Sequence, residues 1–381
     1  MIEQRSLELL MKYKKKGQVQ ITFNWVYVLI AGAVILLFFV GLIARQKSIS
    51  DNRLAADVIR IMESIFTGAQ VSEQTKRLVD TGGLADKTLF FRCSEGVGEY
   101  GIEGLPARTQ NVIDSIFAPT RLEASSLILW SIPYKMPFKV SDFLFVTSSD
   151  VKYYLVGDGQ GFARKFIGRA TDENPQISIK VEKVISLSEI PKGGDDLQYR
   201  IIDVDGVAVS SDSAIPPGLR DIEDDKVTAV SFTGNNEVVF FKKSGNRWLT
   251  LNQQPIPLIS LGSEDDPAKQ AAIFTDDPSI YKCNMQKAFQ RLWFLSEVYE
   301  GKTKELIKYY ELNPGFGNCQ GFVSGFIANE GNVVDNMVLL RTRAHACARI
   351  LDNSCRELND YSQRLKRLNQ MLEKECPLAL Y

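Results

Sequence analysis

Two glycine-rich runs are the first segments of this chain that could bind a nucleotide. The run GVGEYG at 96–101 has the spacing G-x-G-x-x-G, in which backbone N–H groups at the start of a helix face a pyrophosphate. Gly104 and Pro106 follow at once, which argues against such a helix and favours a hairpin loop. The run GDGQG at 157–161 follows a predicted strand and is interpreted as a flexible turn. The phosphate-binding spacing G-x-x-x-x-G-K-[ST] does not occur in the sequence.

Metal and acid–base chemistry have few residues to draw on. His345 is the single histidine, and it stands two residues before Cys347, a spacing that turns the two side chains to different faces of a helix. Zinc needs four converging ligands. Asp203 and Asp205, followed by Gly206, could share one face of a strand, but they do not meet the consensus of a calcium loop. We therefore expect no catalytic residue, no metal and no cofactor.

The cysteines carry more information than the other reactive residues. Five of the six lie in the last third of the chain, and Cys93 lies far from them. Cys347 and Cys355 would be about 12 Å apart along one continuous helix, too far to bond to each other, so each should find a partner elsewhere. In an oxidising compartment we predict at least one disulfide, and the alternative is a set of buried thiols. The candidate disulfide residues are Cys283, Cys319, Cys347, Cys355 and Cys376.

One uncharged apolar run, WVYVLIAGAVILLFFVGLIA at 25–44, predicts a membrane helix. Its twenty residues would rise about 30 Å, the thickness of a hydrocarbon core. Trp25 and Tyr27 lie at one end, where amphipathic rings favour the headgroup region, and Arg45 and Lys47 mark the other end. The alternative is a buried core helix, but core helices seldom run this long without a polar face.

The basic residues around this run predict its orientation. A dense lysine cluster at 12–16 precedes the run, whereas Arg45, Lys47 and Arg53 follow it. The positive-inside rule then places the N-terminus in the cytoplasm and the body outside the cell, as a single-pass protein of the cell membrane. The reverse topology, with the body in the cytoplasm as part of a secretion machine, would be favoured by free thiols throughout.

The segment KKKGQ at 14–18, followed by the apolar run, resembles an archaeal class III signal peptide, the leader of type IV pilin-like proteins. In that family a membrane peptidase cuts after the glycine, and the apolar helix stays on the mature protein. The resemblance implies that Gly17 precedes the cut and that Gln18 becomes the new N-terminus. The family usually has a glutamate at the fifth mature position, which supports filament assembly, and this chain has Thr22 there. An uncleaved signal anchor with a basic flank is the alternative.

The segment from 88 to 262 is predicted to consist mainly of strands, because β-branched and aromatic runs alternate with Gly, Pro, Asp and Ser. The segment 199–234 predicts a β-α-β-like unit with a short helical turn near 217–223, and 237–252 predicts consecutive hairpins. The earlier predicted strands are TLFFRC (88–93), SLILWSI (126–132), DFLFVTS (142–148), VKYYLVG (151–157) and QISIKVEKVISL (176–187).

The last third of the chain is predicted to be helical. Apolar residues at helical spacing indicate one helix that ends near Gly301 and a second that Asn313 and Pro314 stop. A long helix follows from 333 to about 374, with a break near 352–354 and a leucine seam in its second half. Packing within an antiparallel bundle is favoured over an intermolecular coiled coil. The apolar segment CPLALY at 376–381 should dock on the protein, since exposing it would be costly.

These patterns predict an α+β fold: an N-terminal transmembrane helix with a helical stalk, a mixed β-rich domain and a C-terminal helical bundle. The expected segments are a basic cytoplasmic tail at 1–24, the transmembrane helix at 25–44, the stalk at 45–74, the mixed β-rich domain at 75–262 and the helical bundle domain at 263–381.

Composition limits the functions that this fold could serve. The chain has 381 residues and a formal net charge of −1, so no overall field favours nucleic acid. We expect a non-enzymatic, surface-exposed structural or interaction protein, such as a minor pilin-like or envelope assembly component. Its partners would be the membrane and proteins, either copies of itself or envelope components, and no small-molecule substrate is indicated. The alternative is a membrane-tethered enzyme or small-ligand-binding protein that uses the 88–262 domain.

Overall fold

The computed structural model describes most of the chain after residue 88 and parts of the chain before it. The described residues are 25–43, 45–46, 53, 56–57, 59–60, 63, 76–80, 88–105, 108–123, 126–157, 161–261 and 266–381. Contacts divide the chain into two compact units, Met1–Asp57 and Val58–Tyr381. The predicted cytoplasmic tail at 1–24 and most of the predicted stalk at 45–74 lie outside the described residues.

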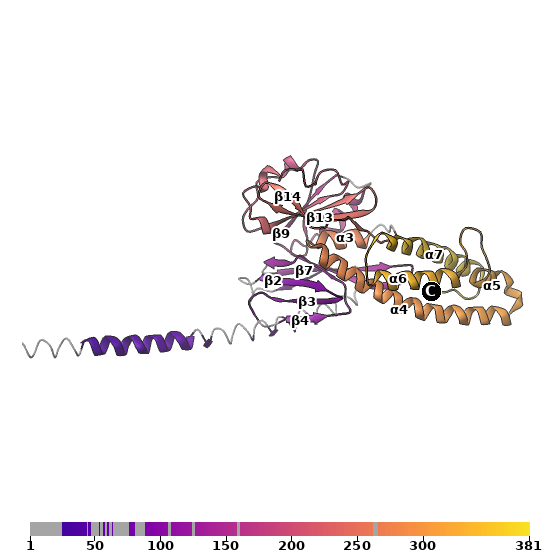
Figure 1. Cartoon of the computed structure of the whole chain (residues 1–381), viewed down its shortest axis with the longest axis horizontal. Coiled ribbons are helices and arrows are strands. Elements are labelled where there is room, and N and C mark those ends of the chain that lie inside the picture. Colours follow the sequence, from indigo (N-terminus) through magenta and orange to yellow (C-terminus); the bar gives the residue numbers. More distant parts are fainter. Residues whose placement is uncertain are drawn as a thin grey trace, which may run out of the picture. The chain divides into compact units, whose positions relative to one another are not determined.

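The first unit contains the helix Trp25–Ile43, drawn in indigo in Figure 1. Its 19 residues would rise about 28 Å, and none of them is buried. A core helix of a soluble protein would bury most of its apolar side chains, whereas Leu36, Leu37 and Phe38 are each more than half exposed. By length and composition this helix could therefore cross a membrane, as a signal sequence near an N-terminus also could.

The largest sheet of the second unit is mixed, with a parallel half and an antiparallel half. Its strand order is β10-β9-β11-β12-β13-β14, with β15 paired to β13. The first four strands in this order are parallel, and β13 begins the antiparallel part. Their bounds are β9 (Val151–Val156), β10 (Lys180–Val184), β11 (Gln198–Asp203), β12 (Val227–Thr233), β13 (Glu237–Ser244), β14 (Arg247–Thr250) and β15 (Ile256–Pro257).

Parallel neighbours need crossover connections, and this sheet has two kinds. Helix α2 (Phe162–Ala170) joins β9 to β10, and a connection with the short 3₁₀ helix Pro217–Leu219 joins β11 to β12. The second crossover confirms the β-α-β-like unit expected at 199–234. Consecutive side chains of β11, Ile201 and Ile202, are both fully buried, which shows that both faces of the sheet are covered.

The predicted strand at 176–187 is wrong over most of its length. Only Lys180–Val184 pairs, with β9. Side chains hold the preceding backbone in turns instead: Asp172 accepts the N–H of Asn174 at 3.2 Å, and Asn174 accepts the N–H of Gln176 at 3.0 Å. Such local bonds compete with a strand ladder, so the alternation of apolar residues did not extend the strand.

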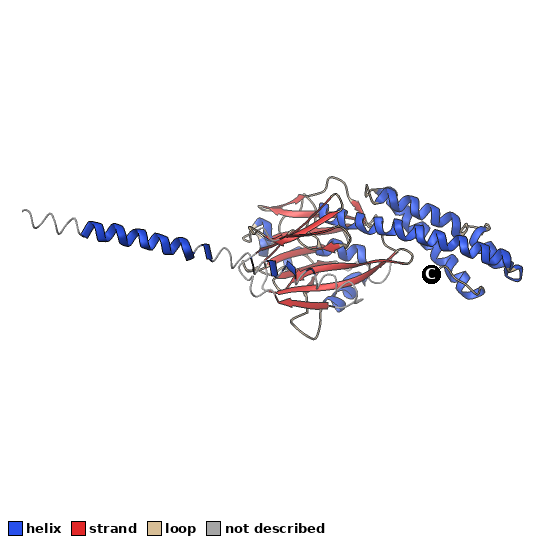
Figure 2. Cartoon of the chain, turned by 90° about the horizontal axis from the view of Figure 1, so that it is seen from below, coloured by secondary structure: helices blue, strands red, loops and turns tan. Residues whose placement is uncertain are grey.

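Two four-stranded sheets complete the strand-rich part of the second unit (Figure 2). One has the order β1-β7-β8-β5, and the other, β4-β3-β2-β6, is antiparallel. Their bounds are β1 (Lys76–Asp80), β2 (Thr88–Ser94), β3 (Val97–Ile102), β4 (Arg108–Asn111), β5 (Ile116–Phe117), β6 (Arg121–Glu123), β7 (Ser126–Lys135) and β8 (Lys139–Ser148).

The C-terminal helices lie side by side beyond the sheets, and α4 runs from the strands into them (Figures 1 and 2). The prediction that a helix ends near Gly301 is wrong, because α4 passes through that exposed glycine. A glycine there costs about 1 kcal/mol, which the packing of Leu306 and Tyr310 offsets. The helices are α3 (Pro267–Phe274), α4 (Pro278–Leu312), α5 (Gly317–Ser324), α6 (Val333–Cys347) and α7 (Glu357–Glu375).

The predicted break of the last long helix is confirmed. Helix α6 ends at Cys347, a 3₁₀ turn spans Asn353–Arg356, and α7 then begins. The leucine seam of α7 packs within the chain against α5 and α6, and its buried members are Leu358, Leu365, Leu368 and Leu372. The end of the chain docks as expected: Asn369 Oδ1 accepts the N–H groups of Leu380 at 2.8 Å and Tyr381 at 3.1 Å.

Polar side chains fasten the first turns of α4 to the sheets. Asn284 Oδ1 accepts the N–H of Ile116 at 3.2 Å, and its carbonyl accepts the hydroxyl of Ser115 at 2.9 Å. Lys287, only 4% exposed, donates from Nζ to the carbonyls of Asn111 at 2.8 Å and Asp114 at 3.2 Å. Helix α3 also contacts β5, β7 and β8, so the helices that open the expected bundle domain pack on strands.

The buried ammonium of Lys287 makes stability depend on pH. Burial lowers the pKa of Lys287 from its ordinary 10.5 to about 8, against a smaller opposing effect of Asp114. Between these values the unfolded chain holds a proton that the folded chain has released, so the free energy of unfolding rises with pH. We expect a gain of up to about 3 kcal/mol from this residue, absent from Lys287→Met.

Urea unfolding of both proteins between about pH 7.5 and 9.5 should show about 2 kcal/mol of this gain, below the pH range where buried tyrosines interfere. Lys308 lies exposed on the same helix, so Lys308→Met should keep the wild-type slope. Equal slopes for wild type and Lys287→Met would contradict the expectation.

Candidate functional site

The structure brings all six cysteines into three bonded pairs. They are Cys93–Cys283, Cys319–Cys376 and Cys347–Cys355, with Cα–Cα distances of 5.7, 5.9 and 5.8 Å. The first pair joins β2 to α4 and closes a separation of 190 residues. The second fastens the end of the chain to α5. These bonds confirm the prediction of at least one disulfide. They also include Cys93, which was not among the candidate disulfide residues.

The expectation that Cys347 and Cys355 each need a distant partner is wrong, because they bond to each other. The expectation assumed one continuous helix between them. The helix ends at Cys347, and Asp352 accepts the N–H of Ser354 at 2.9 Å to start a new turn. The intervening chain folds back, which brings two cysteines eight residues apart within bonding distance.

The residues proposed to anchor and process the N-terminus are only partly described. Trp25 and Tyr27 are 69% and 75% exposed at the start of the apolar helix, and Arg45 is exposed just beyond its end. Lys47, Gly17 and Gln18 lie outside the described residues. The membrane-anchoring and processing roles of these residues therefore stay predictions.

The glycine run at 96–101 forms a hairpin, as predicted, and offers no helix N-terminus. Strands β2 and β3 pair directly, and the turn between them places Glu95 at φ 52° and Gly96 at φ 79°. Two successive positive φ values are typical of the tight turns that match strand twist. Nucleotide binding at this run has no geometric support.

The glycine run at 157–161 lies between β9 and α2, at the carboxyl edge of the parallel strands. Gly157 and Gly161 have φ values of 90° and 89°, and a Cβ at Gly157 would collide with the side chain of Asp205. The strand-to-helix junction was not predicted. Residues 158–160 lie outside the described residues, so the interpretation of this run as a flexible turn is not tested.

The residues weighed for metal and acid chemistry have structural partners. Among the described residues no three His, Cys, Asp or Glu side chains gather as ligands. The ring of His345 lies 4.5 Å from that of Trp293. The buried carboxylate of Asp203 accepts four backbone N–H groups from residues 206–209, at 2.8 to 3.3 Å, and the hydroxyl of Ser231 at 3.0 Å. Asp203 thus holds the loop after β11 in place.

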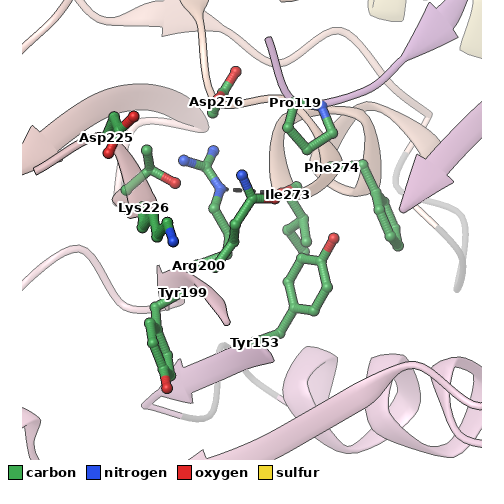
Figure 3. A pocket seen from close by; sticks show the side chains of 11 residues that line it. Pro119, Tyr153, Tyr199, Arg200, Asp225, Lys226, Ile273, Phe274 and Asp276 are labelled. Atoms are coloured by element: carbon green, nitrogen blue, oxygen red, sulfur yellow. Dashed lines mark hydrogen bonds between the residues drawn. The ribbon is translucent and has the colours of Figure 1, made fainter. Parts of the chain in front are cut away.

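A different set of polar residues surrounds a pocket at the amino ends of β11 and β12 (Figure 3). An outer hollow of about 340 Å³ and a narrow inner recess share five lining residues, so the two adjoin each other and are described together as one pocket. The strands contribute through their first residues, and the C-terminal end of α3 and the segment before β6 close the other side. The shared residues are Gln198, Asp225, Lys226, Thr228 and Asp276.

Arg200 is the central side chain of this pocket. It is 4% exposed and lies in β11 between two buried neighbours, Tyr199 and Ile201. Its Nε donates to the carbonyl of Ile273 at 3.1 Å, and its Nη2 donates to the carbonyls of Ala272, at 3.0 Å, and Thr275. These carbonyls end helix α3, where a cation is favoured by the helix dipole. Burial lowers the pKa of Arg200 to about 10, which Asp276 partly opposes, so the side chain stays charged near neutral pH.

Asp276 faces Arg200 across the recess (Figure 3). Burial raises the pKa of Asp276, whereas the charge of Arg200 and two hydrogen bonds from Thr120 lower it. Those bonds run from the Thr120 N–H at 2.7 Å and the Thr120 hydroxyl at 2.9 Å. The pocket therefore brings a buried cation and a half-buried acid together in one lining, with polar groups at its mouth.

Sequence reasoning did not find this pocket. One signal was present: Arg200 interrupts the apolar residues of the predicted strand at 199–206, at a position whose neighbours are buried. A charge inside a covered parallel strand needs a partner, and only the fold shows that the partner is the end of α3.

Comparison of the chain with models of protein families, with curated proteins and with solved structures finds no match. Function is therefore inferred from the residues and their geometry.

Because five donors surround the carboxylate of Asp203, removing its charge should lower the free energy of unfolding. Both carboxylate oxygens of Asp203 accept at least two donors, so Asp203→Asn turns an N–H₂ group toward N–H groups in either orientation. We expect a loss of about 2–3 kcal/mol in the free energy of unfolding, measured by urea titration. The exposed Asp212 serves as a control, and Asp212→Asn should change stability by under about 0.5 kcal/mol. Equal stabilities of the two variants would contradict this role.

The three disulfides should contribute to stability in the order of the length of the loop that each one closes. Sequence separations of 190, 57 and 8 residues give about 5, 4 and 2.5 kcal/mol when loop-closure entropy dominates. Replacing each pair by two serines and measuring unfolding in urea tests the order. A largest loss from the Cys347–Cys355 pair would show that loop length does not govern these bonds.

Proposed function

We propose that this chain is a membrane-anchored, single-pass protein whose folded body lies outside the cytoplasm, as a structural or interaction component of an archaeal-type envelope. The observation that carries the proposal is the pairing of all six cysteines in the body. Disulfides persist in oxidising compartments and are rare in the cytosol. The lysine cluster at 12–16 favours the same orientation, since basic residues stay on the cytoplasmic side.

The N-terminal segment supplies the pilin-like part of the proposal. A leader resembling KKKG before an apolar helix implies cleavage after Gly17, which would leave Gln18 first and the helix in the membrane. Thr22 in place of the usual glutamate favours a minor or membrane-retained component over the main subunit of a filament. The body would then act through its surface, with protein partners and without catalysis.

A second function, binding of a small ligand by the body, is favoured by the pocket around Arg200. Its outer hollow of about 340 Å³ falls in the range of roughly 300–1,000 Å³ that small-molecule sites occupy. This function is compatible with anchoring, because the pocket lies wholly within the second unit of the chain.

Intact-mass measurement on protein extracted from native membranes, with and without thiol alkylation, tests the main proposal. We expect the mass of a chain that starts at Gln18, with no cysteine alkylated before reduction and six alkylated after it. A Gly17→Leu variant should keep the leader, because the side chain blocks the cut, and Gln20→Ala should be processed normally.

The two parts of the proposal can fail separately. An uncleaved chain with oxidised cysteines would contradict the pilin-like hypothesis but would still support an anchored body outside the cytoplasm. Six free thiols, together with protection of the body from protease added to intact cells, would overturn the orientation.

A further inference from the structure

The pocket at the amino ends of β11 and β12 has an unpaired hydrogen-bond donor at its inner end. Nε and Nη2 of Arg200 are occupied by the end of α3, but Nη1 has no hydrogen-bond partner among the described residues. Capping α3 therefore accounts for part of this side chain only. A buried guanidinium nitrogen without an acceptor costs free energy, which an acceptor from a ligand would recover.

The same pocket has an unpaired acceptor two residues away on the same strand. Gln198 Nε2 donates to the carbonyl of Arg121 at 3.2 Å, which fixes the orientation of the amide. Its Oε1 is buried and has no hydrogen-bond donor among the described residues. Residues two apart on a strand point to the same face, so the free donor of Arg200 and the free acceptor of Gln198 serve one cavity.

The charges that line the pocket balance one another. Figure 3 shows Asp225 and Lys226 on one side of the Arg200 guanidinium and Pro119, Phe274 and Tyr153 on the other. A simple anion would meet acids as well as cations, and a simple cation would meet cations as well as acids, so neither gains from the whole set. The lining cations are Arg121, Arg200, Lys226 and Lys242, and the lining acids are Glu123, Asp225, Asp276 and Asp277.

The dimensions limit which part of a ligand reaches Arg200. The inner recess holds about 20 Å³, close to the space of one water or one oxygen atom, whereas the outer hollow holds about 340 Å³. The recess therefore has room for one carboxylate oxygen beside the buried Nη1, and the outer hollow has room for the rest of a small molecule. A single water in the recess could accept from Arg200 Nη1 and donate to Gln198 Oε1, but it would leave the outer hollow unfilled.

We propose that this pocket binds a small zwitterion of the class of free α-amino acids. The carboxylate accepts from Arg200 Nη1, and the ammonium donates to Gln198 Oε1 and to the carboxylate of Asp225. Both ligand charges are then met by opposite charges, and both unpaired protein atoms gain partners. The assignment is independent of the leader and of the orientation in the membrane.

Titration calorimetry of the full chain in detergent tests the proposal, with glycine and L-alanine as probes. N-acetylglycine lacks the ammonium and glycinamide lacks the carboxylate, so each should bind at least tenfold more weakly than glycine. Absence of binding by glycine and L-alanine would overturn the proposal and leave a water-filled pocket. Equal affinity for glycine and N-acetylglycine would overturn it in favour of a plain carboxylate site.

Variants at the mouth separate binding from folding. Asp225 is exposed, so Asp225→Asn should fold normally and bind glycine at least tenfold more weakly. Asp221, exposed and outside the pocket lining, gives the matched control Asp221→Asn, which should bind as the wild type does. Gln198→Met removes the free acceptor at similar size and should also weaken binding, with urea unfolding as the check on its fold. Wild-type affinity in both Asp225→Asn and Gln198→Met would overturn the proposal.

Discussion

The insertion of α4 among the sheets is the interaction on which the body depends. Within two turns this helix carries a cysteine bonded to β2, an asparagine that pairs with the backbone at 115–116, and a lysine whose ammonium is enclosed by two carbonyls. Each contact joins residues more than 160 positions apart, so the helix closes the strand-rich region with the chain that follows it. The rest of α4 then extends into the bundle, where α5 and α6 pack on it. Because one rigid helix of 35 residues serves both regions, the packing of the bundle and the packing of the sheets are mechanically joined.

The cysteine pairs reinforce the same arrangement. Cys93–Cys283 fixes α4 to β2, Cys319–Cys376 holds the end of the chain on α5, and Cys347–Cys355 holds the turn between α6 and α7. Each bond thus lies where a helix begins, ends or meets a sheet. A body fastened at these points suits an oxidising environment outside the cytoplasm, where such bonds persist. The disulfides therefore connect the stability of the body to the redox state of its compartment.

Arg200 connects the fold to the candidate binding site. The end of α3 needs a cation for its unpaired carbonyls, and β11 supplies one from within the large sheet. The guanidinium has more donors than this task uses, and the remaining nitrogen lies buried and unpaired in a side chain that lines a polar pocket. Arg200 consequently caps α3 with one part of its guanidinium and keeps an unpaired donor on the other part. Asp276, held by Thr120, keeps that charge from being isolated in the interior.

The sequence by itself determined the local elements. The apolar run at 25–44, the strands of β-branched and aromatic residues, the hairpin at Gly96 and the break between α6 and α7 all follow from short-range pattern and turn chemistry. Features set by distant residues were missed. The passage of α4 through Gly301, the pairing of Cys93, the bond between Cys347 and Cys355 and the pocket at Arg200 were decided only by the tertiary structure. The physical reason is that burial and partnership depend on segments up to 190 residues away, whose approach no local pattern records.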